Sequence, residues 1–220
     1  MASVSISGDV SGAISIAAPS AAGSGTLTLP TGTDTLIGKA TTDTLTNKSI
    51  AATQLTGTIA AAALPAGSVL QVVSTTKTDT FTSTAATTWT DITGLTVSIT
   101  PRSTSNKILV NFSPCGTSPG NNLYVRLMRD ATPICVGDTS GTRTSNSAGN
   151  FYNPGANAAT TFIFSNLYLD SPSSVSSIVY KLQFWQGAAG TAYFNRAQSD
   201  ADSSQTPRGA STITVQEIAG

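Results

Sequence analysis

The sequence contains no histidine and only one glutamate, Glu217. Because there is no imidazole base, Ser-His-Asp and Cys-His catalysis and histidine-ligated metal sites are excluded. Lys and Arg together number 11, and so do Asp and Glu, which leaves a formal net charge of zero. Such a chain lacks the basic surface with which proteins neutralise nucleic-acid phosphates. We therefore expect a protein that is not an enzyme, needs no cofactor or metal and does not bind nucleic acid.

Long apolar runs are also absent, and aromatic residues are missing from the front of the chain. No stretch approaches the roughly 20 apolar residues that span a bilayer, and the N-terminus MASVSISGDV does not resemble a secretory signal. We expect a soluble protein that is made without a Sec signal and is not inserted in a membrane. All seven Phe, five Tyr and two Trp lie at or beyond Phe81. The sequence therefore divides into an extended segment, residues 1–66, and a rear domain, residues 67–220.

Thr, Ser, Ala and Gly dominate what is present. Charged residues make up 10% of the chain, against about a quarter in typical globular domains. Helix-forming Glu, Lys, Gln and Met are scarce, whereas β-branched Thr, Val and Ile are common, which favours strands over helices. We expect an all-β protein with almost no helix. The run TIAAAAL (residues 58–64) is interpreted either as one or two helical turns or as an extended connector.

The rear domain reads as a series of short strands separated by turn signals. In LYVRLMRD (residues 123–130) and SSIVYKLQFWQ (residues 176–186) the side chains alternate with the two-residue period of a β-strand. About ten such runs without helical interruptions indicate an antiparallel sandwich or barrel, with a jelly roll as the first choice. Phe184 and Trp185 are then expected in the core or at a subunit interface.

The front segment repeats one small polar phrase. TDTLIGK (residues 33–39) returns nine positions later as TDTLTNK (residues 42–48). Its few large apolar side chains bury too little surface to offset backbone ordering, which costs roughly 1 to 2 kcal/mol per residue. The segment is therefore either disordered or folded around a core that is shared between chains.

We expect the shared core, in which three copies wind around one axis. Small Thr, Ser, Ala and Gly side chains would let the three backbones approach closely. Each repeat would form one step of a three-chain shaft, with its leucine facing the axis and its aspartate and lysine outside. The predicted trimer seam consists of Leu36, Leu45, Ile50, Leu55 and Ile59.

One stretch of the rear domain, residues 137–159, is long and rich in Gly, Asn and Ser. Loops of this length are usually functional or disordered. Aromatic rings beside amides suit carbohydrate binding, because the rings stack on sugar faces and the amides bond to hydroxyls; the alternative is simple loop packing. Arg143, Phe151 and Tyr152 are the predicted receptor contacts, with a host surface glycan as the candidate ligand.

A second stretch, residues 195–210, contains the phrase SDADSS. Its Asp200 and Asp202 are the closest approach in the sequence to a glycosidase carboxylate pair, and they also offer oxygen ligands for calcium. A solvated surface turn is the favoured interpretation. Cys115 and Cys135 are interpreted as buried or half-buried small hydrophobes of a protein made in reducing cytoplasm, with a disulfide formed later outside the cell as the alternative.

Several phrases resemble a known group of proteins. GTLTLPTGTDTLIGKATTDTLTNKSI and QLTGTIAAAALPAGSVLQVV are similar to connector phrases of the tail fibres and related surface projections of tailed bacteriophages, especially cyanophage-like ones. ITGLTVSITPRSTSNKILV, VRLMRDATPI, LDSPSSVSSIVYKLQ and ASTITVQEIAG are similar to the terminal head domains of the same group. The resemblance covers most of the chain. It implies a parallel homotrimer on the virion surface, with a thin front portion and a β-sandwich head.

The resemblance leaves the position on the virion open. It implies a short trimeric tail fibre whose head contacts the host surface, or a capsid decoration, cement or head-fibre trimer that clasps the major capsid protein. A fibre-borne enzyme that cuts surface polysaccharide is the third hypothesis. We expect the protein to assemble in the cytoplasm of the host bacterium, to anchor through its front segment, and to contact other virion proteins of the tail, baseplate or capsid.

Overall fold

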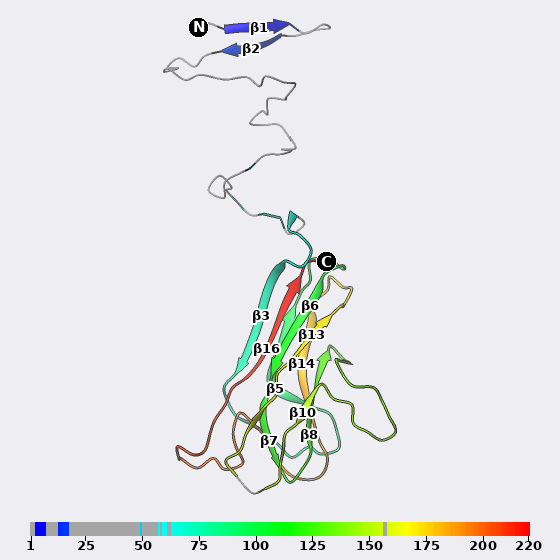
Figure 1. Cartoon of the computed structure of the whole chain (residues 1–220), viewed down its shortest axis with the longest axis vertical. Coiled ribbons are helices and arrows are strands. Elements are labelled where there is room, and N and C mark those ends of the chain that lie inside the picture. Colours follow the sequence, from blue (N-terminus) through cyan, green and yellow to red (C-terminus); the bar gives the residue numbers. More distant parts are fainter. Residues whose placement is uncertain are drawn as a thin grey trace. The chain divides into compact units, whose positions relative to one another are not determined.

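A computed structural model describes residues 3–7, 13–17, 49, 57, 59–60, 63–155 and 158–220 (Figure 1). The chain divides into two compact units, Met1–Thr56 and Gly57–Gly220. In the first unit β1 (Ser3–Ser7) and β2 (Ala13–Ala17) pair antiparallel, with Ile6 opposite Ile14. The front phrases SVSIS and AISIA therefore form a two-stranded sheet. The repeated phrases TDTLIGK and TDTLTNK lie outside the described residues.

The second unit, which we call the head, is built from short strands. They are β3 (Val69–Lys77), β4 (Phe81–Ser83), β5 (Thr90–Ile99), β6 (Lys107–Ser113), β7 (Cys115–Pro119), β8 (Leu123–Arg129), β9 (Thr132–Ile134), β10 (Ala148–Asn150), β11 (Tyr152–Asn153), β12 (Phe162–Ile163), β13 (Asn166–Asp170), β14 (Ile178–Gln186), β15 (Ala192–Phe194) and β16 (Ser211–Ile218). Among the described residues Ala63 alone lies in a helical turn. The expectation of an all-β chain with almost no helix is therefore confirmed for this part of the chain.

The strands of the head form a jelly roll (Figure 1). One sheet has the order β13-β6-β16-β3, and a second has the order β10-β8-β14-β5 with β9 paired to β8. These two orders contain eight strands. When the eight are numbered by their position along the chain, the first sheet has the order 6-3-8-1 and the second has the order 5-4-7-2. That order is two Greek keys folded into a sandwich. A smaller sheet, β11-β7-β15-β4 with β12 also on β7, completes the head.

Alternation along the strands places the core between the two long sheets. In β14 every second residue from Ile178 to Phe184 is buried, whereas the residues between them are half-buried. Other strands contribute the buried side chains Ile92, Leu95, Val97, Ile99, Ile108, Val110, Phe112, Leu123, Val125, Leu127, Ile213 and Val215. Burying one such aliphatic or aromatic side chain is worth about 1.5–3 kcal/mol. The inward half of each strand therefore specifies the predicted antiparallel sandwich.

One buried carboxylate joins the two sheets through this core. Asp170, at the end of β13, accepts a hydrogen bond of 2.6 Å from the Tyr180 hydroxyl in β14. It also accepts bonds of 2.8 and 3.1 Å from Nη1 of Arg129, at the end of β8. Burial of Tyr180, together with its bond to Asp170, raises the pKa of the phenol. Because each member has a partner, the cluster avoids the cost of an unpaired buried charge.

The structure tests the sequence interpretation of four further side chains. Cys115 is buried, Cys135 is half-buried and both are free thiols, as the first interpretation expected. Phe184 is fully buried, but Trp185 is half-buried on the outer surface of the sheet. The core interpretation is therefore wrong for Trp185, because consecutive residues of a strand point to opposite faces. Its alternative role at a subunit interface stays a prediction.

Candidate functional site

The first candidate site is the outward surface of the β13-β6-β16-β3 sheet, which mixes apolar and uncharged polar side chains and is almost free of charge. Strand register places the following residues on it: Val69, Val72, Ser74 and Thr76 of β3, Thr212, Thr214, Gln216 and Ile218 of β16, Leu109, Asn111 and Ser113 of β6, and Leu167 and Leu169 of β13. We call this set the uncharged face. Lys107 lies at its margin, opposite Ile218.

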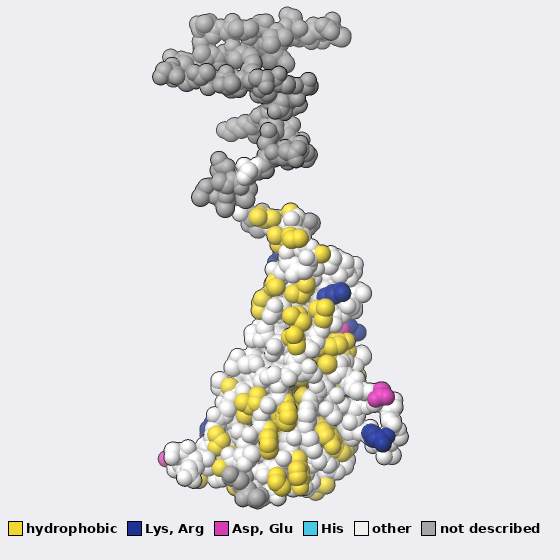
Figure 2. Space-filling model, in the orientation of Figure 1, with side chains coloured by type: hydrophobic (Ala, Val, Ile, Leu, Met, Phe, Trp, Pro, Cys, Tyr) yellow, Lys and Arg dark blue, Asp and Glu magenta, His cyan; other side chains and the backbone are white. Residues whose placement is uncertain are grey.

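Apolar side chains of the uncharged face are unusually exposed. The exposed fractions are 51% for Val69, 57% for Val72, 57% for Leu167 and 47% for Leu169. Polar groups between them pair with each other, as the Ser74 and Thr214 hydroxyls do at 2.7 Å. The side of the head seen in Figure 2 carries hydrophobic patches separated by uncharged polar surface, with the charged side chains near its rim. Patches of this kind mark interaction surfaces.

The outward surface of the β5-β14-β8 region has a different character. We call it the aromatic face, and its residues are Trp89, Asp91, Tyr124, Arg126, Lys181, Gln183 and Trp185. Trp185 lies directly opposite Tyr124 in the register of β14 and β8. Their rings stack with centroids 5.7 Å apart and an interplanar angle of 20°. The Arg126 guanidinium carbon lies 4.2 Å from the centroid of the Trp89 ring.

A continuous row of hydrogen bonds crosses the aromatic face between these rings. Arg126 donates bonds of 3.0 and 2.7 Å from Nε and Nη2 to Oε1 of Gln183. Gln183 Nε2 donates to Oδ1 of Asp91 at 2.7 Å, and Lys181 Nζ donates to Oδ2 of the same carboxylate at 2.8 Å. Partial burial acts to raise the pKa of Asp91, but the bonds from Lys181 and Gln183 outweigh it and hold that pKa below its ordinary value.

The aromatic face could not be predicted from the sequence, although the alternation within each of its strands was visible there. The phrases LYVRLMRD and SSIVYKLQFWQ show which residues share a face within each strand. They do not show that β8 and β14 are neighbours, or that Arg126 lies opposite Gln183. Trp89 precedes its strand and is brought to the face by the turn before β5.

The structure separates the three predicted receptor contacts. Arg143 is exposed and donates a 2.7 Å bond to the Ser140 hydroxyl of its own loop. Tyr152 is 42% exposed. Phe151 is fully buried and meets the Phe164 ring edge-on, with centroids 4.7 Å apart. The prediction is therefore wrong for Phe151, because this part of the chain is not a loop but the short strands β10 and β11, whose pairing turns Phe151 into the core. A receptor role for Arg143 and Tyr152 stays a prediction.

Four residues of the predicted trimer seam, Leu36, Leu45, Ile50 and Leu55, lie outside the described residues. Ile59 is described and is 55% exposed. A seam joins separate chains, so it stays a prediction. The division into an anchoring segment, residues 1–66, and a head, residues 67–220, also stays a prediction in its functional sense.

The Asp200 and Asp202 loop forms a pocket of about 400 Å³. Arg208 donates bonds of 3.0 and 2.7 Å to the Asp200 carboxylate, and Arg196 lies 3.5 Å away. These arginines, with the bond from Arg208 first, lower the pKa of Asp200. A glycosidase acid needs a raised pKa, so the arrangement does not suit that role. Within the described residues no group of three or more acidic, cysteine or histidine side chains could hold a metal ion.

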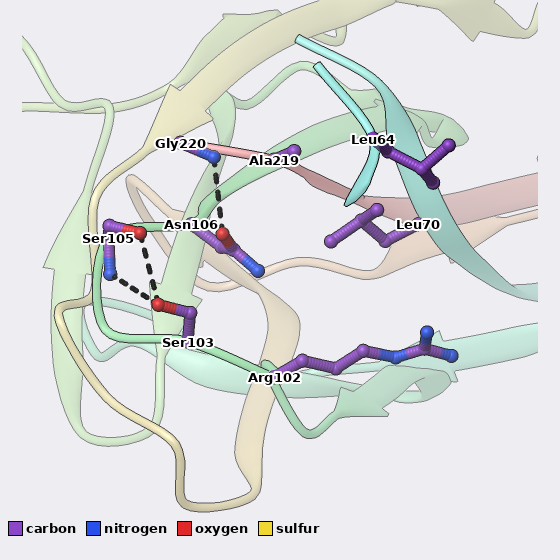
Figure 3. A pocket seen from close by; sticks show the side chains of 8 residues that line it. All are labelled: Leu64, Leu70, Arg102, Ser103, Ser105, Asn106, Ala219 and Gly220. Carbon is purple, nitrogen blue, oxygen red and sulfur yellow. Dashed lines mark hydrogen bonds between the residues drawn. The ribbon is translucent and has the colours of Figure 1, made fainter. Parts of the chain in front are cut away.

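A second pocket, of about 340 Å³, lies where the chain enters the head (Figure 3). Its lining residues are Leu64, Leu70, Arg102, Ser103, Ser105, Asn106, Ala219 and Gly220. Backbone bonds of 2.8 Å in both directions tie the C-terminal Ala219 to Gly67 and Ser68. Arg102 is the one ionisable side chain among the lining residues, so the pocket offers no acid and base pair. The pocket therefore lies where backbone hydrogen bonds hold Ala219 beside the segment that leads into β3.

Comparisons with known proteins add little to this geometry. No protein-family model matches the chain, and no curated protein matches it. Similar solved structures are the infectious bursal disease virus Gt strain (TM-score 0.35, 14% identity), a mutant VP2 protein of that virus in derived T=1 particles (0.34, 14%) and its Gx strain (0.33, 13%). In the same order, the matched regions cover 68%, 68% and 69% of this chain. This chain spans 38%, 36% and 42% of the length of the three viral chains. Likeness at these TM-scores carries no conclusion about this chain.

In the part of the chain that the structure describes, no helix is long and apolar enough to cross a bilayer.

Proposed function

We propose that this chain is a structural protein of a bacteriophage virion surface, namely a short homotrimeric tail fibre whose jelly-roll head contacts the host cell. The observation that carries the proposal is the uncharged face, with its exposed Val72, Leu167 and Leu169. The cores of protein interfaces are depleted of charged residues. A face that is itself uncharged is therefore suited to contact with a second copy of the same chain.

Two further observations support this proposal. The sequence phrases quoted above resemble phage fibres in both the front segment and the head. Double-sheet jelly rolls occur in viral capsid proteins and in lectins, although one fold hosts many functions. The argument for self-association therefore rests on the uncharged face and not on the fold.

The trimer is tested by placing charge on the uncharged face. We expect the full-length protein to be a trimer in native mass spectrometry and the double variant Leu167→Lys, Leu169→Lys to be a monomer, because burying two unpaired ammonium groups is strongly unfavourable. Val175→Lys is the matched control, since Val175 is 55% exposed in the loop before β14. It should leave the trimer intact. A wild-type protein that stays monomeric at all concentrations would contradict the proposal.

The uncharged face would serve a capsid decoration trimer equally well, which makes that the second candidate function. The two differ in where the protein lies on the particle. Electron cryomicroscopy of intact virions should place its density at the tail. Density distributed over the capsid shell would instead show that the protein is a decoration protein and not a tail fibre.

A further inference from the structure

We propose that the aromatic face binds a hexose-containing polysaccharide. This inference rests on the proposed function in one respect only, namely that the polysaccharide lies on a cell surface. The recognising groups are the rings of Trp89, Tyr124 and Trp185 and the hydrogen-bonded row that joins Arg126, Gln183 and Asp91.

The rings are held in place by their neighbours. Trp185 stacks on Tyr124, and the Arg126 guanidinium lies over the Trp89 ring. Sugars present apolar C–H faces with a slight positive potential, and aromatic ring faces carry the complementary negative potential. All three rings are half-buried, so they are supported from below while part of each stays at the surface. The loop after β14, residues 187–190, contains only Gly and Ala. No side chain larger than a methyl group therefore covers Trp185 from that loop.

The polar row supplies fixed donors and acceptors for hydroxyl groups. Arg126 has five N–H donors, of which the two at Nε and Nη2 bond to Gln183. Lys181 and Asp91 likewise keep donors and lone pairs beyond their mutual bond. Because these side chains already hold one another in position, a ligand loses less entropy by ordering them. Hydroxyl groups, which both donate and accept, match such a mixed row.

A second copy of the chain is a less suitable occupant of this face. Dimer contact would remove the Asp91 and Lys181 charges from water, and their mutual attraction only partly offsets that desolvation. A sugar chain leaves the face wet, so the charges keep their water. The uncharged face carries no such cost. The chemistry therefore assigns self-association to one face and sugar binding to the other.

The test titrates the full-length protein with short oligosaccharides of glucose, galactose, mannose and N-acetylglucosamine, and follows tryptophan fluorescence and calorimetric heat. We expect at least one of them to bind with a millimolar Kd. Trp185→Ala and, separately, Trp89→Ala should raise that Kd by about tenfold or more. The matched control is Tyr193→Ala, since Tyr193 is also a half-buried ring under an arginine, with Cζ of Arg196 5.2 Å from its centroid. It should bind as the wild type does.

Native mass spectrometry of the same variants separates this proposal from the proposed function. Trp185→Ala should keep the oligomeric state of the wild type. If Trp185→Ala dissociates the oligomer, the aromatic face is a subunit interface and the sugar proposal is wrong. If none of the oligosaccharides binds at about 10 mM, or if Tyr152→Ala abolishes binding while Trp185→Ala does not, the proposal is also wrong.

Discussion

The two outward faces of the sandwich share one scaffold and differ in chemistry. The uncharged face presents Val, Leu, Thr and Ser, whereas the aromatic face presents Trp and Tyr around the charged Asp91, Arg126 and Lys181. Both faces follow from the same two-residue alternation, in which aliphatic and aromatic core residues fill most of the inward positions. The inward half of each strand fixes the jelly roll. The outward half is therefore free to differ between the sheets, and it does.

The charge pattern shows how the difference works. On the aromatic face Asp91 pairs with Lys181 at 2.8 Å, and Arg126 donates hydrogen bonds to Gln183. On the uncharged face hydroxyl groups take the polar positions, and Lys107 stands at the margin. Charged side chains keep a surface hydrated, whereas a surface without them has a small desolvation cost when a partner covers it.

The largest expected effect comes from the Asp170 cluster, which links the sheet of the uncharged face to the sheet of the aromatic face. Asp170→Ala leaves the Arg129 guanidinium and the Tyr180 hydroxyl without their acceptor, and we expect a loss of about 3 kcal/mol in the free energy of unfolding. Urea denaturation measures this loss. Tyr180→Phe removes only one neutral donor and should cost about 1 kcal/mol. Equal losses for the two variants would show that the carboxylate does not hold the sheets together.

Much of this scaffold could be predicted from the sequence. The alternation in SSIVYKLQFWQ and the scarcity of helix formers are local signals, and they gave the strands and the antiparallel sandwich. Asp170 shows where such signals end. It ends a strand-like run, and nothing in that run shows that the fold buries its carboxylate against Tyr180 and against Arg129 of the other sheet.

The second prediction concerns Glu217, which lies on the inner side of β16, beneath the uncharged face. Its carboxylate accepts bonds of 2.6 Å from the Arg102 backbone N–H and from Asn106, and one of 2.7 Å from Gln71. Burial acts to raise the pKa of Glu217, but these bonds outweigh it and lower that pKa. Glu217→Gln places an amide donor against these donors, so we expect a loss of about 2 kcal/mol at pH 7.

The pH dependence of this loss follows from the direction of the shift. A carboxyl group whose pKa is lowered by folding stabilises the protein above its ordinary pKa, 4.5 for Glu217, and that stabilisation is lost as the pH falls through the folded value. The difference between wild type and Glu217→Gln in urea unfolding should therefore shrink below about pH 4.5. A difference that stays constant down to the acid transition would contradict this account.

The candidate sites were harder to predict than the scaffold, and Phe151 and Trp185 show why. Phe151 stands in a Gly, Asn and Ser-rich phrase that resembles a loop, but short strand pairings turn it into the core. Trp185 follows the core residue Phe184 and looks like part of one apolar run, yet it faces outward. Both errors concern partners across the sheet. A single sequence shows which residues share a side of one strand, but it does not show which strands are neighbours.

The smallest expected effect on stability is at Asp91, and it sharpens the contrast between the faces most directly. The Asp91 and Lys181 pair is partly exposed, with side-chain exposures of 51% and 28%, so Asp91→Asn should change the free energy of unfolding by less than about 1 kcal/mol. It replaces one of the two acceptor oxygens of Asp91 by an amide donor, however, and should weaken oligosaccharide binding without altering the oligomeric state.

Thr214→Asp is the matched change on the uncharged face, because it also alters one charge at a strand position that faces outward. It should reduce self-association in native mass spectrometry and leave oligosaccharide binding by the separated chains unchanged. If Asp91→Asn and Thr214→Asp instead affected both properties equally, the two faces would not be separate sites. Because the faces lie on opposite sheets with the buried core between them, we expect each substitution to act on its own face alone.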